Sequence, residues 1–224
     1  MGNEMADESA LRHAMVRVAE ELDARGLNRG TSGNVGARCG ERILVTPSGV
    51  PARDLTAQGM VLLAPNGDVI DAGRPSSEWR FHRDILLSRP DINAVVHVHS
   101  PFATTLACLG LEVPPFHYMI AAAGGSTIRC APYALFGTQE LSDHALAALK
   151  DRKACLLANH GMIATGRDLS EALALCVEVE SLCEQYWRAR QIGEPRHLSE
   201  AAMAEVMEKF KTYGPRAEGK QAAA

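Results

Sequence analysis

The stretch AVVHVHSPF, residues 94–102, combines an apolar run with two histidines, His97 and His99. The apolar run predicts a buried strand, and the serine and proline after it predict a helix capped by Ser100 with Pro101 at its first position. Side chains two residues apart on a strand share one face, roughly 6–7 Å apart along it. The two imidazoles therefore either converge on one metal ion or are partly buried and bonded to their neighbours. The spacing alone leaves both interpretations open.

Strands and helices alternate on both sides of this stretch. Apolar periodicity and capping residues predict helices over 8–25, 76–88, 100–110, 138–150, 168–191 and 198–214. Strands are expected over 41–50 and 94–99, as a hairpin over 60–73 turning at Asn66–Gly67, and as two short strands within 153–166. Segment 26–38 is too rich in glycine for a helix, and 120–133 reads as a loop feeding a short strand. No repeat or linker interrupts the chain, so we expect one α/β domain over residues 1–224, ordered from about 8 to 214.

Composition limits the function classes. The chain has 224 residues, of which 46% are hydrophobic and 22% charged, as in an ordinary globular protein. A net charge of −4 without a basic patch argues against a nucleic-acid partner. No apolar stretch approaches the roughly 18 residues of a membrane span, and the acidic start MGNEMADESA does not read as a secretory signal. Six cysteines without a CxxC pair predict neither disulfides nor a thiolate zinc site, so we expect a reducing, cytoplasmic location.

Three short turns are rich in small polar residues. GTSGNVG, residues 30–36, offers Thr31 and Asn34, TPSGV offers Ser48 and Gly49, and Ser76 and Ser77 precede an expected helix. Each turn alone is either a plain connection or part of an anion cradle built from N–H and hydroxyl donors. Together, the three turns favour a bound phosphate that is held with little basic charge.

Glu78 and His160 extend the chemistry. Glu78 follows the serines, where an acid either compensates the helix dipole or serves as a base aimed into the same pocket. His160, in ANHGMIATG, follows an apolar run and precedes a glycine. Three imidazoles with an open position are a common catalytic zinc site, but only the fold can bring His160 to His97 and His99. His82 is expected to be structural. The remaining histidines, His13, His117, His144 and His197, have no comparable context.

These motifs together resemble those of the class II aldolase/adducin family, most closely its L-fuculose-1-phosphate aldolases. GTSGNV, TPSG, PSSEWRFH, AVVHVH, HYMIAAAGG, CAPYALFGT and NHG occur in the family's order, and EKFKTYG resembles its C-terminus. The resemblance runs from about residue 8 to residue 214. It implies an α/β fold of αβα layers, with a central, mostly antiparallel sheet of nine strands between helices. It also implies a homotetramer with sites at the subunit interfaces.

The resemblance further assigns roles to residues. It implies a zinc ion held by His97, His99 and His160, with Glu78 as the acid/base residue that approaches the metal in the resting state. It places Tyr118, from a neighbouring subunit, near the aldehyde oxygen and Tyr213 at the catalytic C-terminus. The implied phosphate contacts are Thr31, Asn34, Ser48, Gly49, Ser76 and Ser77.

The implied reaction is the reversible, zinc-dependent cleavage of a ketose 1-phosphate, through a metal-stabilised enediolate, to dihydroxyacetone phosphate and an aldehyde. L-Fuculose 1-phosphate and a 5-deoxypentulose 1-phosphate such as 5-methylthioribulose 1-phosphate are both open as substrates, and another divalent metal could replace zinc. One alternative is a pentulose-phosphate 4-epimerase, against which HYMIAAAGG and Glu78 argue. The other is a non-catalytic, adducin-like assembly module, against which the complete set of three histidines and Glu78 argues.

Overall fold

The structure is a computed structural model that describes residues 2–211. Its helices are α1 Gly2–Ala24, α2 Trp79–Ser88, α3 Pro101–Cys108, α4 Gln139–Ala148, α5 Leu169–Ile192 and α6 Glu200–Phe210, with 3-10 helices η1 Ala52–Asp54, η2 Ala57–Gly59 and η3 Tyr118–Ala123. Its strands are β1 Asn34–Cys39, β2 Arg42–Val45, β3 Val61–Leu63, β4 Ala94–Val98, β5 Cys130–Ala131, β6 Ala154–Leu157 and β7 Gly161–Gly166. No helix within residues 2–211 is long and apolar enough to cross a bilayer.

The strands form one sheet in the order β3-β2-β1-β4-β7-β6-β5. Every neighbouring pair is antiparallel except β5 and β6, which confirms the expected mostly antiparallel sheet. The sheet has seven strands in residues 2–211, whereas the family resemblance implied nine. Two further contacts, Pro47–Pro75 and Val113–Ile128, are isolated bridges that do not extend into strands.

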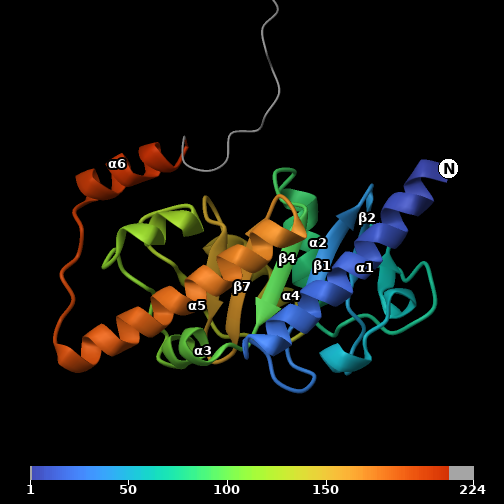
Figure 1. Ribbon diagram of the computed structural model, residues 1–224, viewed down its shortest axis with the longest axis horizontal. Helices are drawn as coiled ribbons and strands as arrows, with labels where there is room; N and C mark the ends of the chain where they lie inside the picture. Colours follow the sequence, from blue (N-terminus) through green and yellow to red (C-terminus); the bar gives the residue numbers. More distant parts are fainter. Residues whose placement is uncertain (1, 212–224) are drawn as a thin grey trace, which may run out of the picture.

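Helices cover both faces of the sheet, as expected for αβα layers. Helices α1 and α5 lie across one face, on which α3 also packs, while α2 and α4 lie behind the sheet (Figure 1). The apolar residues of alternate strand positions divide accordingly into two cores. Val96 and Met162 belong to the core under α1, α3 and α5, whereas Val95 and Ile163 belong to the core under α2 and α4. This division follows from the alternation of side chains along a strand.

Several expected elements differ in detail from those observed. Strand β1 lies in the glycine-rich segment from which no strand was predicted, because Gly36 leaves the segment without a continuous apolar pattern. The expected hairpin over 60–73 is reduced to β3 and one bridge between Leu63 and Val69. Helix α2 begins at Trp79 with Glu78 at the N-cap position, so the helix start expected at residue 76 is wrong. The Ser76 hydroxyl accepts a hydrogen bond from the backbone N–H of Glu78 at 3.2 Å.

The sheet register brings one end of three central strands together. Asn34, at the start of β1, pairs with His97, near the end of β4. Val98, the last residue of β4, pairs with Met162, the second residue of β7. His160, which immediately precedes β7, therefore lies beside the end of β4. This register is what joins the two distant histidine motifs.

Candidate metal centre and active site

His97 is the innermost side chain of the site. It is fully buried on β4, on the sheet face that α2 and α4 cover. Its Nδ1 lies 2.9 Å from the backbone carbonyl oxygen of Met162, to which Nδ1–H donates a hydrogen bond. A neutral imidazole that donates from Nδ1 keeps its lone pair on Nε2. Nε2, which points to the centre of the site, is therefore the atom available to a cation, and the β7 backbone fixes the ring's orientation.

His99 and His160 complete a ring of three imidazoles. The ring centroids of the three histidines are separated pairwise by 4.8 to 4.9 Å. The Nε2 atoms of His97 and His99 are 3.0 Å apart. Burial lowers the pKa of His160 to about 4 and also lowers the pKa of His99, and the neighbouring His97 adds to both effects while Glu78 opposes them. Both side chains are therefore neutral near pH 7, with lone pairs free to bind a cation.

Two features of the surrounding structure, a buried carboxylate and a glycine, hold the backbone next to His99 and His160 in place. Glu180 of α5 accepts hydrogen bonds from the hydroxyl of Ser100 and from the backbone N–H groups of Phe102 and Ala103, at 2.6 to 2.8 Å. This buried carboxylate fixes the turn that follows His99 and caps α3 from outside. Gly161 lets the turn of His160 approach β4, because a Cβ at Gly161 would lie 2.3 Å from the carbonyl oxygen of Val98.

Glu78 faces the three histidines from the start of α2. Its Oε2 lies 3.2 Å from Nε2 of His97, and its Oε1 lies 3.2 Å from Nε2 of His160. The side chain is buried, which by itself raises the pKa of the carboxyl. The interaction with His97 and a hydrogen bond from Asn34 outweigh burial and hold the pKa well below its usual range. Glu78 is therefore an ionised carboxylate at neutral pH.

These four side chains fit a divalent cation. One donor atom from each of Glu78, His97, His99 and His160 lies within 4.8 Å of the others. Ligands about 2.0 Å from an ion in tetrahedral geometry are roughly 3.3 Å apart, close to the separations of 3.0 and 3.2 Å found here. Oε1 of Glu78 is buried and has no hydrogen-bond partner among the described residues. A buried carboxylate oxygen without a donor is costly, and a cation would satisfy it.

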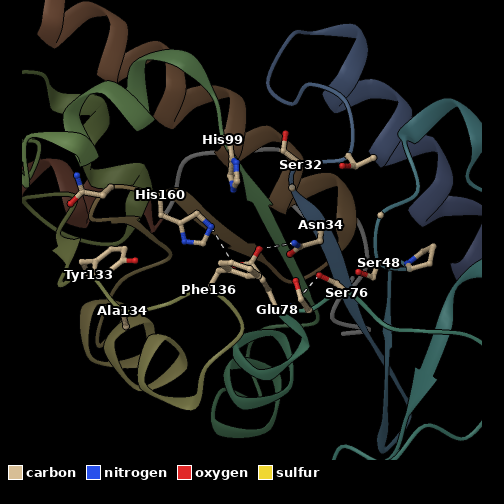
Figure 2. Close-up of a pocket in the computed structure, with 16 residues that line it drawn as sticks. Ser32, Asn34, Ser48, Ser76, Glu78, His99, Tyr133, Ala134, Phe136 and His160 are labelled. Carbon is tan, nitrogen blue, oxygen red and sulfur yellow. Dashed lines mark hydrogen bonds and ion pairs between the residues drawn. The ribbon is translucent and has the colours of Figure 1, made fainter.

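Glu78, His99 and His160 of the metal-ligand cluster form one wall of a cavity of about 340 Å³, a volume suited to a small metabolite. The opposite wall consists of the three polar turns, and Figure 2 shows Glu78 between the histidines on one side and Asn34, Ser48 and Ser76 on the other. All six residues expected to contact phosphate line the cavity: Thr31, Asn34, Ser48, Gly49, Ser76 and Ser77. No lysine or arginine is among the described residues that line it. Neutral hydrogen-bond donors thus line this side of the cavity, and their contact with a phosphate stays a prediction.

The structure adds cavity residues that were not singled out from the sequence. Tyr133, Ala134 and Phe136 form a largely apolar wall, and Asn159 lies next to His160. Tyr133 is 60% and Phe136 is 62% exposed, which is unusual for large aromatic side chains. The sequence feature that could have indicated this wall is the run of apolar and aromatic residues in CAPYALFGT, which lies outside any predicted helix.

Of the two tyrosines expected to be catalytic, Tyr118 belongs to the described residues, and it does not line this cavity. Tyr118 lies on η3 and is 51% exposed, outside the residues that line the cavity of a single chain. A position at the surface is compatible with the expected contribution of Tyr118 to a neighbouring subunit's site. Tyr213 lies outside the described residues.

Comparison with known proteins agrees with this geometry. Residues 13–187 match the family model described as Class II Aldolase and Adducin N-terminal domain. The chain is 56% identical to a 5-methylthioribulose-1-phosphate/5-deoxyribulose-1-phosphate aldolase of Rhodospirillum rubrum over 93% of this chain and 95% of that protein. It is 47% identical to the L-fuculose phosphate aldolase of Escherichia coli K12, over 95% of this chain and 99% of that protein. A solved L-fuculose 1-phosphate aldolase superposes with a TM-score of 0.87 at 37% identity, over 90% of this chain and 96% of that one.

The chain therefore belongs to the class II aldolase and adducin family. Within that family it is an enzyme, a class II aldolase, because both of these close relatives are aldolases and the histidine and glutamate cluster of a metal-dependent lyase is complete.

Proposed function

We propose that this protein cleaves a ketose 1-phosphate reversibly to dihydroxyacetone phosphate and an aldehyde, with a zinc ion held by His97, His99 and His160. The observation that carries the proposal is the position of Glu78, whose carboxylate lies between three convergent imidazoles and a cradle of neutral phosphate donors. A site of this shape holds a phosphate at one end and a reactive carbonyl at the other. The chemistry that the ion supplies when bound is Lewis-acid stabilisation of negative charge on substrate oxygens.

The cradle serves to position the substrate. Hydroxyls of Thr31, Ser48, Ser76 and Ser77, with the Asn34 amide and the Gly49 backbone, bind the phosphate and fix the carbon chain relative to Glu78. Holding the reacting carbon beside the base converts binding energy into rate. Neutral donors are sufficient because hydrogen bonds to a charged acceptor are roughly twice as strong as neutral ones.

Glu78 and Tyr118 move the protons. In the direction of synthesis, the carboxylate of Glu78 takes a proton from the carbon next to the ketone, and that carbon forms the new bond to the aldehyde carbon. Tyr118 of a neighbouring subunit donates a proton to the oxygen of the aldehyde. Cleavage runs the same steps in reverse, so the carbon–carbon bond breaks and its electron pair is finally protonated by Glu78. Tyr213 would complete the site from the C-terminus.

Among ketose phosphates, we favour 5-methylthioribulose 1-phosphate or 5-deoxyribulose 1-phosphate over L-fuculose 1-phosphate. The relative named for the first two substrates is 56% identical, against 47% for the relative named for the third. The wall of Tyr133, Ala134 and Phe136 offers apolar surface at the aldehyde end. This surface suits a methylthio group, or a methyl group without the hydroxyl-bearing carbon that L-fuculose 1-phosphate has between its methyl group and C4.

A homotetramer of single-domain chains in the cytoplasm completes the proposal. Support comes from Tyr118, Leu135 and Phe136, which are each more than half exposed although they are large and apolar or aromatic. All six cysteines are free, as a reducing compartment would keep them. Light scattering after gel filtration should give four times the 24.1 kDa mass of the chain. A monomer would contradict the role of Tyr118 in a neighbouring site.

The substrate proposal is tested by measuring kcat/KM for release of dihydroxyacetone phosphate from the two substrate types with zinc-loaded protein. We expect cleavage of both, with the larger kcat/KM for 5-methylthioribulose 1-phosphate. A larger value for L-fuculose 1-phosphate would overturn the preference. No release from either compound would overturn the proposed function.

A further inference from the structure

His82 is a fully buried histidine that does not line the cavity. It lies on α2, one helical turn after Glu78, and faces β1. Its Nε2 is 2.6 Å from Oδ1 of Asn34. Nδ2 of Asn34, in turn, donates to Oε2 of Glu78 at 3.0 Å. A continuous chain of hydrogen bonds therefore runs from His82 through Asn34 to the carboxylate that faces the metal-ligand cluster.

The direction of every hydrogen bond in this chain is determined by Glu78. A carboxylate only accepts, so Asn34 must present its amide nitrogen to Glu78 and its amide oxygen to His82. An amide oxygen also only accepts, so Nε2 of His82 must carry a hydrogen and donate it. Burial lowers the pKa of His82 to about 3, and the neighbouring His97 adds to this effect while Glu78 opposes it. His82 is thus a neutral imidazole with its hydrogen on Nε2.

The imidazole has no room to adopt another arrangement. A Cβ at Gly36 of β1 would lie 2.5 Å from Nδ1 of His82, so the strand backbone lies directly against the ring. The ring of Phe81 packs close to the imidazole, with its centroid 4.6 Å from that of His82. Nδ1 has no hydrogen-bond partner among the described residues. The ring therefore makes one directed contact, to Asn34, and no other hydrogen bond.

A purely structural role explains this arrangement poorly. A buried ring nitrogen without a partner costs free energy, and an apolar side chain of similar size would avoid that cost. What an apolar side chain would lack is the single donor that holds Oδ1 of Asn34. Without that donor, the Asn34 amide is free to rotate about its terminal torsion, which has a broad distribution. The function of His82 must therefore be sought in the orientation of Asn34.

We propose that His82 is a positioning residue for the proposed aldolase reaction: through Asn34 it sets the orientation of the Glu78 carboxylate that transfers the proton. This inference rests on the proposed function. Asn34 has a second amide N–H that the chain of hydrogen bonds does not use, and Asn34 also lines the cavity. The same amide can thus contact the phosphate and the base, and His82 fixes it for both.

Two matched amide variants separate positioning from packing. In His82→Gln the side-chain nitrogen reaches the place of Nε2, whereas in His82→Asn the shorter side chain leaves its nitrogen near the place of Nδ1. Both variants bury one amide, so their folding costs are similar. We expect kcat to fall roughly 10- to 100-fold in His82→Asn, as for other small misplacements of a catalytic group. KM should rise as well in His82→Asn, because Asn34 also lines the phosphate cradle. His82→Gln should restore most of both losses.

A double-mutant cycle tests whether His82 acts through Asn34. The single variant Asn34→Ala and the double variant Asn34→Ala, His82→Asn should have the same kcat, because the link to Glu78 is already broken in both. Equal losses from His82→Asn in the wild-type and Asn34→Ala backgrounds would show that His82 acts independently of Asn34 and would overturn the inference. Gly36→Ala offers a second route to the same disturbance, because its methyl group displaces the His82 ring without changing any polar atom.

A spectroscopic measurement supplies a readout that does not depend on turnover. In protein labelled with nitrogen-15 histidine, His82 should be the neutral tautomer with its hydrogen on Nε2, both at neutral pH and near pH 5. A neutral ring with its only hydrogen on Nδ1 would contradict the proposed chain, because Nε2 would then have no hydrogen to donate to Asn34. If wild-type protein releases no dihydroxyacetone phosphate, the proposed function fails. If wild type is active and His82→Asn matches His82→Gln in kcat, only the role of His82 fails.

Discussion

Asn34 and His97 are direct partners across the antiparallel pair of β1 and β4, and their side chains meet the same oxygen of Glu78. Nδ2 of Asn34 lies 3.0 Å and Nε2 of His97 lies 3.2 Å from Oε2. One pair of facing residues in the sheet therefore supplies both a member of the metal-ligand cluster, His97, and the hydrogen-bond donor to the Glu78 carboxylate, Asn34. The N-terminus of α2 then needs only to place one carboxylate against this pair.

Glu78→Gln should reduce kcat by roughly 10²- to 10⁴-fold, the range for removal of a general acid/base. Substrate binding should change little, because glutamine keeps the size of the side chain and its contact with Asn34. The measurement is steady-state release of dihydroxyacetone phosphate. Glu140→Gln, an exposed residue of α4, is the matched control and should behave as wild type. Unchanged turnover in Glu78→Gln would exclude Glu78 as the proton carrier.

His160→Ala should lower the content of bound divalent metal well below one ion per chain. The variant removes one of three imidazole ligands, while the buried core of β4 and β7 stays intact. Elemental analysis after dialysis against metal-free buffer measures the loss. His197→Ala, at an exposed position outside the cluster, should retain full metal content. Equal metal content in the two variants would place the ion elsewhere.

Ser77→Ala and Ser48→Ala should each raise KM for a ketose 1-phosphate about 10-fold or more, because each removes a hydrogen bond to a charged group. Both hydroxyls line the cavity opposite the histidines. The internal control is the kcat/KM for the same ketose without its phosphate, which neither substitution should alter. A parallel fall for both compounds would indicate a general distortion and not a lost phosphate contact.

The stability of the protein should depend on pH through His82. The pKa of His82 is about 3 in the fold, against 6.5 for an ordinary histidine. Between these values the unfolded chain binds a proton that the folded chain does not. Above about pH 6.5, His82 therefore does not reduce the free energy of unfolding. Below that pH, the free energy of unfolding decreases by up to about 1.4 kcal/mol per pH unit as the pH falls.

Urea unfolding of wild type and His82→Gln at a series of pH values between neutral and pH about 5 measures this contribution. The free energy of unfolding should fall less steeply with decreasing pH in His82→Gln, because the buried titrating group is gone. Parallel curves for the two proteins would mean that His82 is protonated equally in the folded and unfolded states.

The local patterns of the sequence predicted most of the elements and the ligand histidines. Alternation along 94–99 placed His97 and His99 together, and the capped amphipathic segments gave α3, α4 and α5 close to their observed bounds. Strand β1 was missed because glycine and small polar residues conceal its alternation. Its packing depends on β2 and β4, which local patterns do not show.

The long-range part of the site depended on register. His160 joins the cluster because Val98 pairs with Met162, a relationship between segments far apart in the sequence. His82 was expected only to be structural. Its burial and its contact with Asn34 follow from the packing of α2 on β1, which no local pattern predicts. The aromatic wall of Tyr133 and Phe136 was missed for the same reason, since its segment reaches the cavity only through the fold.

The most direct test of the account is titration of metal-depleted protein with zinc while cleavage of 5-methylthioribulose 1-phosphate is measured. The account predicts no release of dihydroxyacetone phosphate from the depleted protein, and a linear recovery of activity that ends at one zinc ion per chain. Full activity in the depleted protein would contradict the claim that His97, His99 and His160 hold a catalytic ion.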